Sequence, residues 1–433
     1  MSAYLEGELD NHVDENLQKE RHALDWLQRA GASFPKLRIG HLEGGERGVF
    51  ARADIEPGEE LLRVPRQCLL TLERARASDI GRLIEAHAPH TDEESYLAAF
   101  LLQEREREDS TWKPYLELLP KDFSHLPLFF TEEELSLLKG SAMLREVARW
   151  RELLLGKYAQ LIERVPGFSR YTPDAFLWAQ FTLLSRTFGL TLEGQFVRGF
   201  VPLADMLNHR QSPEAAWGMS EDGAAFVLVA LKDVPAGEEI HISYGVKPNY
   251  RFLLNYGFVP EHNADDELVL YLGIPEDDPW AAEKRELLAL SNPTARRRFD
   301  VPLHYEHAAT AAMFSFLRVA YAGTEELAHL TVAAKMEEGL GLVRPLSMAT
   351  EERVLGALGE LCEARLAGFE TTLEEDERLL LEENLSRNKR NCLLLLRGEK
   401  RLLLAYAGLA RTFLPPRSSA PPDDSAEAEG ECP

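Results

Sequence analysis

The chain has 433 residues, of which 45% are hydrophobic, and a formal net charge of −24 at pH 7. A chain of this length exceeds what one compact core organises, so we expect two or three domains. The negative charge repels nucleic acids and anionic membranes, which argues against direct nucleic acid binding or a membrane surface and favours a protein partner with a basic segment.

The four cysteines, Cys68, Cys362, Cys392 and Cys432, lie far apart and form no CxxC pair. Their spacing argues against a zinc ribbon or a disulfide scaffold and favours a reducing compartment. The first residues, MSAYLEGELD, lack the basic and apolar regions of a signal peptide. No apolar run reaches the roughly 18 residues of a membrane-spanning helix. We therefore expect a cytoplasmic protein.

In chain order, the first predicted element is an amphipathic helix over 15–30 that ends at Gly31. Residues 36–65, KLRIGHLEGGERGVFARADIEPGEELLRVP, are typical of short strands joined by glycine-rich turns. The end of this segment, DIEPGEELLRV (54–64), resembles DVPAGEEIHIS (233–243). We therefore expect two small sheets that are built in the same way from distant parts of the chain.

Between these β segments, apolar residues recur at helical spacing. Four helices are predicted there, over 96–107, 132–139, 143–163 and 173–186. The last has Thr172 as its N-cap and Pro173 at its first position. After 265 the helical pattern returns and predicts long helices over 308–321, 351–367 and 371–413. The final residues, RSSAPPDDSAEAEGECP, have almost no large apolar side chain, so we expect them to be disordered.

Several familiar signatures are missing from the sequence. It has no GxxxxGK[ST] phosphate loop and no GxSxG nucleophile elbow, and GGERG (44–48) lacks the spacing of a dinucleotide-binding GxGxxG motif. HYEH (304–307) holds two histidines at i and i+3, but a third ligand is not evident. We therefore expect no metal site.

Three polar clusters remain, LLSRTF (183–188), ADMLNH (204–209) and EEIHISYGVKPNYRFLLNYGF (238–258). In the second cluster, Asp205, Asn208 and His209 follow an apolar run, and buried polar groups are costly unless they are satisfied. Taken singly, each cluster also fits a structural role, as a solvated helix end, a satisfied polar turn or a core tyrosine.

Together and in this order, the clusters resemble the SET-domain methyltransferases, within the branch that includes the rubisco large-subunit lysine methyltransferase and the actin-histidine methyltransferase. The family motifs correspond here to ERGVFA (46–51), SRTF (185–188), DMLNH (205–209), ISYG (242–245) and NYGFV (255–259). The resemblance spans nearly the whole chain, and the lack of cysteine-rich zinc flanks fits this branch. One departure is Gly45-Glu46, where relatives often have Glu-Gly.

The resemblance implies an α+β fold in which small sheets form the SET-domain pseudoknot, with a helical insertion that splits it and an all-helical C-terminal substrate-binding domain. Residues 1–90 would hold the N-terminal helix and the first part of the SET domain, and residues 91–195 the insertion. Residues 196–264 would complete the SET domain with the catalytic motifs. The helical domain would occupy 265–415, and a disordered acidic tail 416–433. A monomer is expected.

The cofactor that the resemblance implies is S-adenosylmethionine. Its carboxylate would pair with Arg186, since a guanidinium matches a carboxylate bidentately. Its ammonium and adenine edge would bind at Asn208 and His209, and Asp205 would bond neighbouring backbone or His209. The other cofactor-binding residues are expected to be Glu46 and Arg47, through their backbone groups, together with Ser185, Asp205, Tyr256 and Phe258.

The resemblance makes Tyr244 the catalytic residue, which would orient the acceptor and contact the methyl or sulfonium group. Phe188, Tyr244 and Tyr256 would line the substrate channel, where aromatic rings hold an alkyl stem and its ammonium. Phe188 and Tyr256 are both aromatic, as in the lysine-modifying relatives, whereas the matching positions of the actin-histidine enzyme are not. We therefore favour a lysine acceptor over a histidine.

Two alternatives stay open at this point, a protein-histidine methyltransferase and a catalytically silent SET-fold binding module. The C-terminal helical domain resembles the substrate-docking module of the family. Its acidic stretch EEDE (374–377) either steers a lysine-rich protein or is a solvated helix face.

Overall fold

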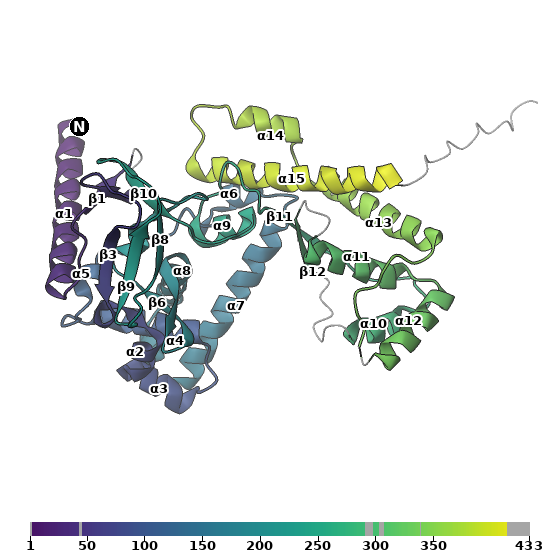
Figure 1. Cartoon of the computed structure of the whole chain (residues 1–433), viewed down its shortest axis with the longest axis horizontal. Helices are drawn as coiled ribbons and strands as arrows, with labels where there is room; N and C mark the ends of the chain where they lie inside the picture. Colours follow the sequence, from purple (N-terminus) through teal and green to yellow (C-terminus); the bar gives the residue numbers. More distant parts are fainter. Residues whose placement is uncertain (1, 43–45, 291–297, 303–306, 338, 414–433) are drawn as a thin grey trace, which may run out of the picture. The chain divides into compact units, whose positions relative to one another are not determined.

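The computed structural model describes residues 2–42, 46–290, 298–302, 307–337 and 339–413 (Figure 1). Two compact units make up the chain, one from residues 1–135 and 143–259 and the other from 136–142 and 260–433. Within the described residues, none of the helices combines the length and apolar character that a bilayer crossing demands. The predicted disordered tail, Gly45 and His304 lie outside the described residues.

A four-stranded sheet in the first unit joins the two β segments of the sequence. Its strand order is β1 (Leu37–His41), β2 (Arg47–Ala51), β10 (Glu239–Ile242) and β7 (Asn208–His209). Strand β10 pairs antiparallel with β2 and parallel with β7. The sheet therefore brings three sequence motifs together that the helical insertion and a long β segment separate along the chain.

Two three-stranded sheets complete the β part of this unit. One has the order β3 (Glu60–Pro65), β9 (Ala225–Ala230) and β8 (Ala215–Met219), and the other β4 (Leu70–Thr71), β6 (Gln195–Phe200) and β5 (Thr187–Leu192). The similar segments 54–64 and 233–243 thus supply strands to different small sheets, as predicted. The sheets are not built in the same way, however, because one has three antiparallel strands and the other has four strands with a parallel pair. The two segments are also neighbours, because Ile55 bridges Val234 and the Ala236 N–H donates to Asp54 Oδ1 at 2.8 Å.

The helices of the first unit are α1 (Ser2–Arg29), α2 (Leu72–Ala77), α3 (Asp79–His87), α4 (Glu93–Glu106), α5 (Lys113–Leu116), α6 (Glu132–Ser136), α7 (Met143–Arg164), α8 (Pro173–Arg186) and α9 (Asn249–Tyr256). Helix α8 begins as predicted, since the Thr172 hydroxyl accepts from the Ala175 N–H at 3.1 Å and Pro173 opens the helix. Its apolar residues Phe176 and Phe181 are fully buried. This packing holds the last residue of α8, Arg186, at the start of β5.

The described residues of the second unit are helical apart from one antiparallel strand pair, β11 with β12, which the sequence analysis did not predict. Its elements are β11 (Glu267–Tyr271), α10 (Ala281–Ala289), β12 (Arg298–Pro302), α11 (Ala308–Tyr321), α12 (Thr324–Met336), α13 (Met348–Ala367), α14 (Leu373–Leu379) and α15 (Arg387–Phe413). Helix α15 packs along α13 and α14, and its buried Leu403 and Tyr406 belong to the core of this unit.

The single helix predicted over 371–413 is wrong, because two helices with a break between them occupy this stretch. A capping box at Thr372, with Glu375 as its third residue, starts α14. After α14 ends at Leu379, the Ser386 hydroxyl accepts from the Lys389 N–H at 3.3 Å at the start of α15. Short polar side chains therefore bind the backbone at new helix starts where the leucine spacing alone suggested continuity.

The acidic stretch EEDE is also not one continuous charged face. Asp376 is fully buried and pairs with the equally buried Lys400, while it accepts from the Thr371 hydroxyl at 2.6 Å. Glu375 serves the capping box, and Glu377 pairs with Arg401 at 2.5 Å on the surface. The interpretation of the whole stretch as a solvated or steering face is therefore wrong for Asp376, which joins α14 to α15.

The two neighbouring ion pairs allow a direct test of this assignment. We expect Asp376→Ala to lower the free energy of unfolding by about 3–5 kcal/mol, because it leaves the Lys400 ammonium buried without its counter-charge. Glu377→Ala removes an exposed partner and should cost less than about 1 kcal/mol. Urea unfolding of both variants, followed by circular dichroism, measures the difference. Equal losses in the two variants would contradict the structural role of Asp376.

Candidate active site

The ADMLNH cluster enters the site through a strained turn. Leu203 has φ 74° and ψ −42°, although it is not a glycine, and the 3-10 helix Ala204–Met206 follows it. A backbone conformation of this kind costs on the order of 1–3 kcal/mol. The buried Leu203 side chain anchors the turn in the core. The turn directs Asn208 and His209 into β7, parallel to His241 and Ile242 of β10.

Asn208 joins three strands at the crossing. Its side-chain N–H groups donate to the backbone oxygen of Arg47 at 3.0 Å and to Glu239 Oε1 at 2.7 Å. The close approach also explains the glycine of ERGVFA, because a Cβ at Gly48 would lie 2.3 Å from Glu239 Oε1 and 3.3 Å from Asn208 Nδ2. The Asn208 side chain is therefore committed to holding β7 against β2 and β10.

His209 and Tyr244 are in direct contact. The Tyr244 N–H donates to His209 Nδ1 at 3.0 Å, and the Tyr244 hydroxyl donates to the Leu207 backbone oxygen at 2.8 Å. Burial lowers the pKa of His209, so its ring is neutral and can accept this hydrogen bond. Burial raises the pKa of Tyr244 well above its ordinary value. Tyr244 is thus a protonated hydrogen-bond donor and not a general base.

An aromatic cluster surrounds this pair. The rings of Tyr244 and Tyr256 lie 4.7 Å apart, and the His209 ring stacks on Phe252 at 4.9 Å and lies 6.0 Å from Phe258. Burial raises the pKa of Tyr256 to about 12, so its hydroxyl is also protonated at neutral pH. The segment that holds the second Tyr-Gly pair thus folds back onto the first pair, and its aromatic residues pack against both Tyr244 and His209.

Gly257 allows the chain to fold back in this way after α9. It caps α9 with φ 73°, a left-handed conformation that favours glycine. A Cβ at this position would lie 2.2 Å from His125 Cδ2 and 2.7 Å from the His125 backbone oxygen. Both the backbone conformation and the close approach of His125 therefore require glycine between Tyr256 and Phe258.

Arg186 meets a buried carboxylate. Its Nη1 donates to the Asp205 backbone oxygen at 2.9 Å and to Asp205 Oδ2 at 3.2 Å. The same Oδ2 accepts from the buried Tyr115 hydroxyl at 3.0 Å. The predicted bond from Asp205 to His209 or to neighbouring backbone is wrong, because the carboxylate is turned toward Arg186 and Tyr115. Burial raises the pKa of Asp205, and Arg186 opposes that rise.

Tyr115 was not predicted as a site residue. It comes from α5 in the helical insertion, distant in sequence from all three motifs, and only the folded chain brings it to Asp205. Nothing in the local sequence around Tyr115 distinguishes it from a core tyrosine. Its hydroxyl holds the carboxylate that orients Arg186.

Two polar atoms of this group remain without a hydrogen bond. Arg186 Nε and Asp205 Oδ1 are both buried and have no partner in the structure. Unsatisfied buried groups of this kind are rare in folded proteins, and each one calls for an explanation, such as an ordered water molecule. The Arg186–Asp205 pair therefore keeps one donor and one acceptor without a partner.

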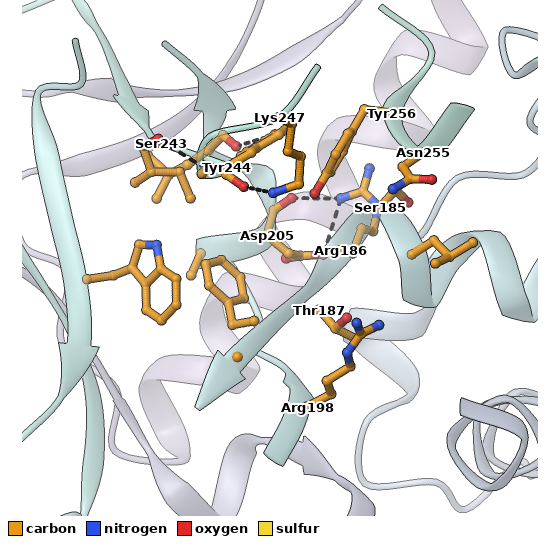
Figure 2. Close-up of a pocket in the computed structure, with 18 of the residues that line it drawn as sticks. Ser185, Arg186, Thr187, Arg198, Asp205, Ser243, Tyr244, Lys247, Asn255 and Tyr256 are labelled. Atoms are coloured by element: carbon orange, nitrogen blue, oxygen red, sulfur yellow. Dashed lines mark hydrogen bonds and ion pairs between the residues drawn. The ribbon is translucent and has the colours of Figure 1, made fainter. Parts of the chain in front are cut away.

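Beside these residues opens a pocket of about 520 Å³, within the range of small-molecule sites (Figure 2). Of the predicted site residues, Ser185, Arg186, Phe188, Asp205, Tyr244 and Tyr256 line it. Figure 2 shows Tyr244, Tyr256, Asp205 and Arg186 gathered around one space. The Ser185 hydroxyl donates back to the Phe181 backbone oxygen at 2.7 Å, so it can offer a ligand only its acceptor lone pairs.

The other predicted residues are not among the residues that line the pocket, namely Glu46, Arg47, Asn208, His209 and Phe258. Glu46 accepts from the Leu42 N–H at 2.8 Å through its backbone oxygen. The Arg47 side chain turns inward and donates to the Leu118 backbone oxygen. Burial and the nearby Arg186 lower the pKa of Arg47.

Sequence reasoning also missed part of the pocket wall. Trp217 of β8 packs edge-to-face on Phe188, with ring centroids 5.1 Å apart, so two aromatic rings form that side. Arg198, Lys247 and Arg251 add positive charge to the lining. Lys247 and Arg251 belong to the third cluster, but the sequence analysis assigned roles only to aromatic residues of that cluster. Among the described residues, no group of three or more His, Cys, Asp or Glu side chains could hold a metal ion.

Two family models match the sequence, the SET domain over residues 46–245 and the Rubisco LSMT substrate-binding domain over residues 275–403. A fructose-bisphosphate aldolase-lysine N-methyltransferase of Arabidopsis thaliana, described as chloroplastic, is 31% identical over 377 residues, which are 82% of this chain and 75% of that protein. An actin-histidine N-methyltransferase of Gallus gallus is 28% identical over 426 residues, which are 93% of this chain and 69% of that protein.

A solved structure matches the fold as well. The crystal structure of the SET domain of LSMT bound to lysine and AdoHcy superposes with a TM-score of 0.79 at 26% sequence identity, and the match covers 91% of each chain. The similarity therefore includes both compact units and the strands that carry the site.

The requirement for glycine at position 257 predicts an unequal effect of two alanine substitutions. Gly167 has a similar φ of 76° but open space around its Cβ position, so Gly167→Ala should cost only the left-handed strain of roughly 1–2 kcal/mol. Gly257→Ala adds the clash with His125, and we expect it to cost about 2 kcal/mol more. Urea unfolding measures both, and equal costs would contradict the close approach of His125.

The contact between His209 and Tyr244 predicts that the pKa of His209 is lowered in the folded protein. Because the folded state holds the neutral ring, its stabilising contribution is complete above pH 6.5 and is lost as the pH falls through the lowered folded pKa. We expect nuclear magnetic resonance to give a His209 pKa below 6.5. The signal that His209→Gln removes identifies the residue. A His209 pKa at or above 6.5 would contradict the buried, neutral ring.

Proposed function

The chain belongs to the SET-domain protein methyltransferases that carry a rubisco LSMT substrate-binding domain, and from this membership we propose that it methylates a lysine side chain of a protein. The family uses S-adenosylmethionine, and solved relatives hold AdoMet or AdoHcy. The observation that carries the proposal is the pocket itself. It joins an incompletely bonded Arg186–Asp205 pair to a wall that includes Tyr244 and Tyr256.

The residues of the pocket fit this cofactor. Arg186 lines the pocket and is partly exposed, and its guanidinium would hold the carboxylate of the cofactor, while Asp205 keeps the guanidinium in place. The backbone at Glu46, Arg47, Asn208 and His209 is proposed to complete the site. When bound, S-adenosylmethionine supplies a methyl group on a positively charged sulfur, and the chain has to align an acceptor nitrogen with that methyl group.

The role of Tyr244 is to orient the acceptor and to make a polar contact with the methyl group. Its proton is engaged with the Leu207 backbone oxygen, so the phenolic oxygen can accept weak contacts from a polarised C–H group. Its raised pKa removes it as a base. The acceptor lysine, with an ordinary pKa of about 10.4, must therefore lose its proton to water, which burial and nearby positive charge favour. Alignment of the acceptor can contribute about 7–11 kcal/mol to such a reaction in favourable cases.

Aromatic walls support lysine as the acceptor. Phe188, Trp217 and Tyr256 line the pocket, and flat rings suit a long alkyl stem that ends in an amine. The bound lysine in the LSMT structure is in line with this choice. Protein histidine is the second candidate, because the actin-histidine relative matches over almost the whole chain.

We also propose the role of the helical unit and the setting of the enzyme. Residues 275–403, which match the substrate-binding model, would dock the protein substrate. The net charge of −24 favours a substrate with basic surface. The composition and the cysteine spacing support a cytoplasmic protein, and we propose a monomer.

Methyl transfer to extract proteins tests the proposal. Incubation of the purified chain with methyl-labelled S-adenosylmethionine and a cell extract should label one or a few proteins. Amino-acid analysis of the labelled product should give methyl-lysine, and methyl-histidine would support the second candidate. We expect Tyr244→Phe to reduce labelling by at least 10²-fold, on the scale of a lost transition-state contact.

A matched control separates this effect from general damage. Tyr158 also donates its hydroxyl to a backbone oxygen, that of Tyr171 at 2.7 Å, but is not among the pocket-lining residues. Tyr158→Phe should label like the wild type. The assigned role of Tyr244 is wrong if Tyr244→Phe labels as strongly as Tyr158→Phe.

A further inference from the structure

The aromatic wall of the pocket continues to the surface of the protein. Phe188 is buried, Trp217 packs on it and is half-buried, and Phe196 is 71% exposed, yet all three line the pocket. A side chain that lines a pocket and is mostly exposed lies at the mouth of that pocket. The acceptor side chain would fill the inner part, so Phe196 faces the part of the substrate beside the acceptor.

A tight hairpin fixes the position of Phe196 in the chain. Strands β5 and β6 pair antiparallel up to Leu192 and Gln195, and the turn between them consists of Glu193 and Gly194, with φ 52° and 77°. Positive φ at both central residues is the signature of a type I′ turn, and the turn type of a two-residue hairpin fixes its register. Phe196, the second residue of β6, is therefore held at a defined place on the hairpin.

The ring of Phe196 lies over Gly189 of the neighbouring strand. A Cβ at Gly189 would be 2.6 Å from Cε2 and 2.7 Å from Cζ of that ring. Gly189 pairs with Arg198, two residues beyond Phe196, so the glycine and the ring are diagonal neighbours on one face of the hairpin. The ring thus rests on the backbone of β5 while most of the side chain stays exposed, and such an ordered ring loses little conformational entropy when it binds a partner.

A second exposed apolar side chain belongs to the same region of the site. Val246 is 81% exposed and lies in the sequence between two lining residues, Gly245 and Lys247. Among the described side chains of the first unit, Val246 and Phe196 are the two most exposed large apolar ones. Single exposed apolar residues are common on protein surfaces, whereas several at one place mark an interaction site.

We propose that Phe196 contacts a large apolar side chain of the substrate protein within two residues of the acceptor. The inference rests on the proposed function and specifies the local sequence that the enzyme selects. Two residues of an extended peptide span about 7 Å, so a side chain at this distance stays at the mouth while the acceptor fills the channel. Burial of apolar surface between the two side chains stabilises the complex.

A double-mutant cycle between enzyme and substrate tests the inference. Once mass spectrometry has located a labelled site, each large apolar residue within two positions of the acceptor is replaced by serine. We expect one of these replacements to lower kcat/KM of the wild-type enzyme about tenfold, which corresponds to about 1.4 kcal/mol. Phe196→Ser should cause a similar loss with the unchanged substrate, and the two changes together should lose little more than either one.

Two controls separate this effect from general damage. Leu231 is also an exposed apolar residue, at 53%, but is not among the lining residues, so Leu231→Ser should keep the rate of the wild type. Calorimetry with S-adenosylhomocysteine should give Phe196→Ser the wild-type affinity, because the ring is expected to meet the substrate. Weaker binding of S-adenosylhomocysteine by Phe196→Ser would make the ring a cofactor contact and overturn the inference.

Gly189→Ala tests the position of the ring without removing it. Its added methyl group would displace the Phe196 ring, so we expect a several-fold loss of kcat/KM in the wild-type background and no further loss in Phe196→Ser. Equal losses in both backgrounds would show that position 189 acts without the ring. Additive losses in the cycle between enzyme and substrate, or no effect of any flanking apolar replacement, overturn the inference. Absence of label on any protein instead overturns the proposed function.

Discussion

The parallel pairing of Asn208 and His209 with His241 and Ile242 is the contact on which the site depends. It places a short polar segment at the edge of the four-stranded sheet, beside β10, and the Asn208 side chain ties that segment to the backbone of Arg47 in β2. The N–H and the hydroxyl of Tyr244 both bond to this segment. All three hydrogen bonds are partly buried, so they fix the position of Tyr244 relative to both strands.

The electrostatics of the site follow from how that crossing is buried. Arg47 and Arg186 approach one another around Asp205, and Glu20 also acts on Arg47 as a counter-charge. Removal of one member of such a buried charge group would leave the others without compensation, which is costly. The helical insertion takes part through Tyr115, which holds Asp205 in place. The insertion therefore contributes a side chain to the candidate site.

Local patterns in the sequence revealed the motifs, the start of α8 and the two small sheets, because capping, glycine-rich turns and strand alternation depend on neighbouring residues. The sequence could not reveal that Tyr115 binds Asp205, because only the folded chain brings the two residues together. The same holds for Leu203, whose positive φ is imposed by packing. The leucine spacing led to the wrong prediction of one helix over 371–413, because Thr372 and Ser386 start two helices that the apolar pattern does not separate.

The central claim is that the space between Arg186 and the tyrosine pair receives the methyl donor. A crystal structure of the complex with S-adenosylhomocysteine tests it most directly. The account predicts the ligand carboxylate about 3 Å from a nitrogen of the Arg186 guanidinium, with the sulfur directed toward the gap that Tyr244 and Tyr256 border. A ligand bound elsewhere, or one whose sulfur faces away from both tyrosines, would contradict the account.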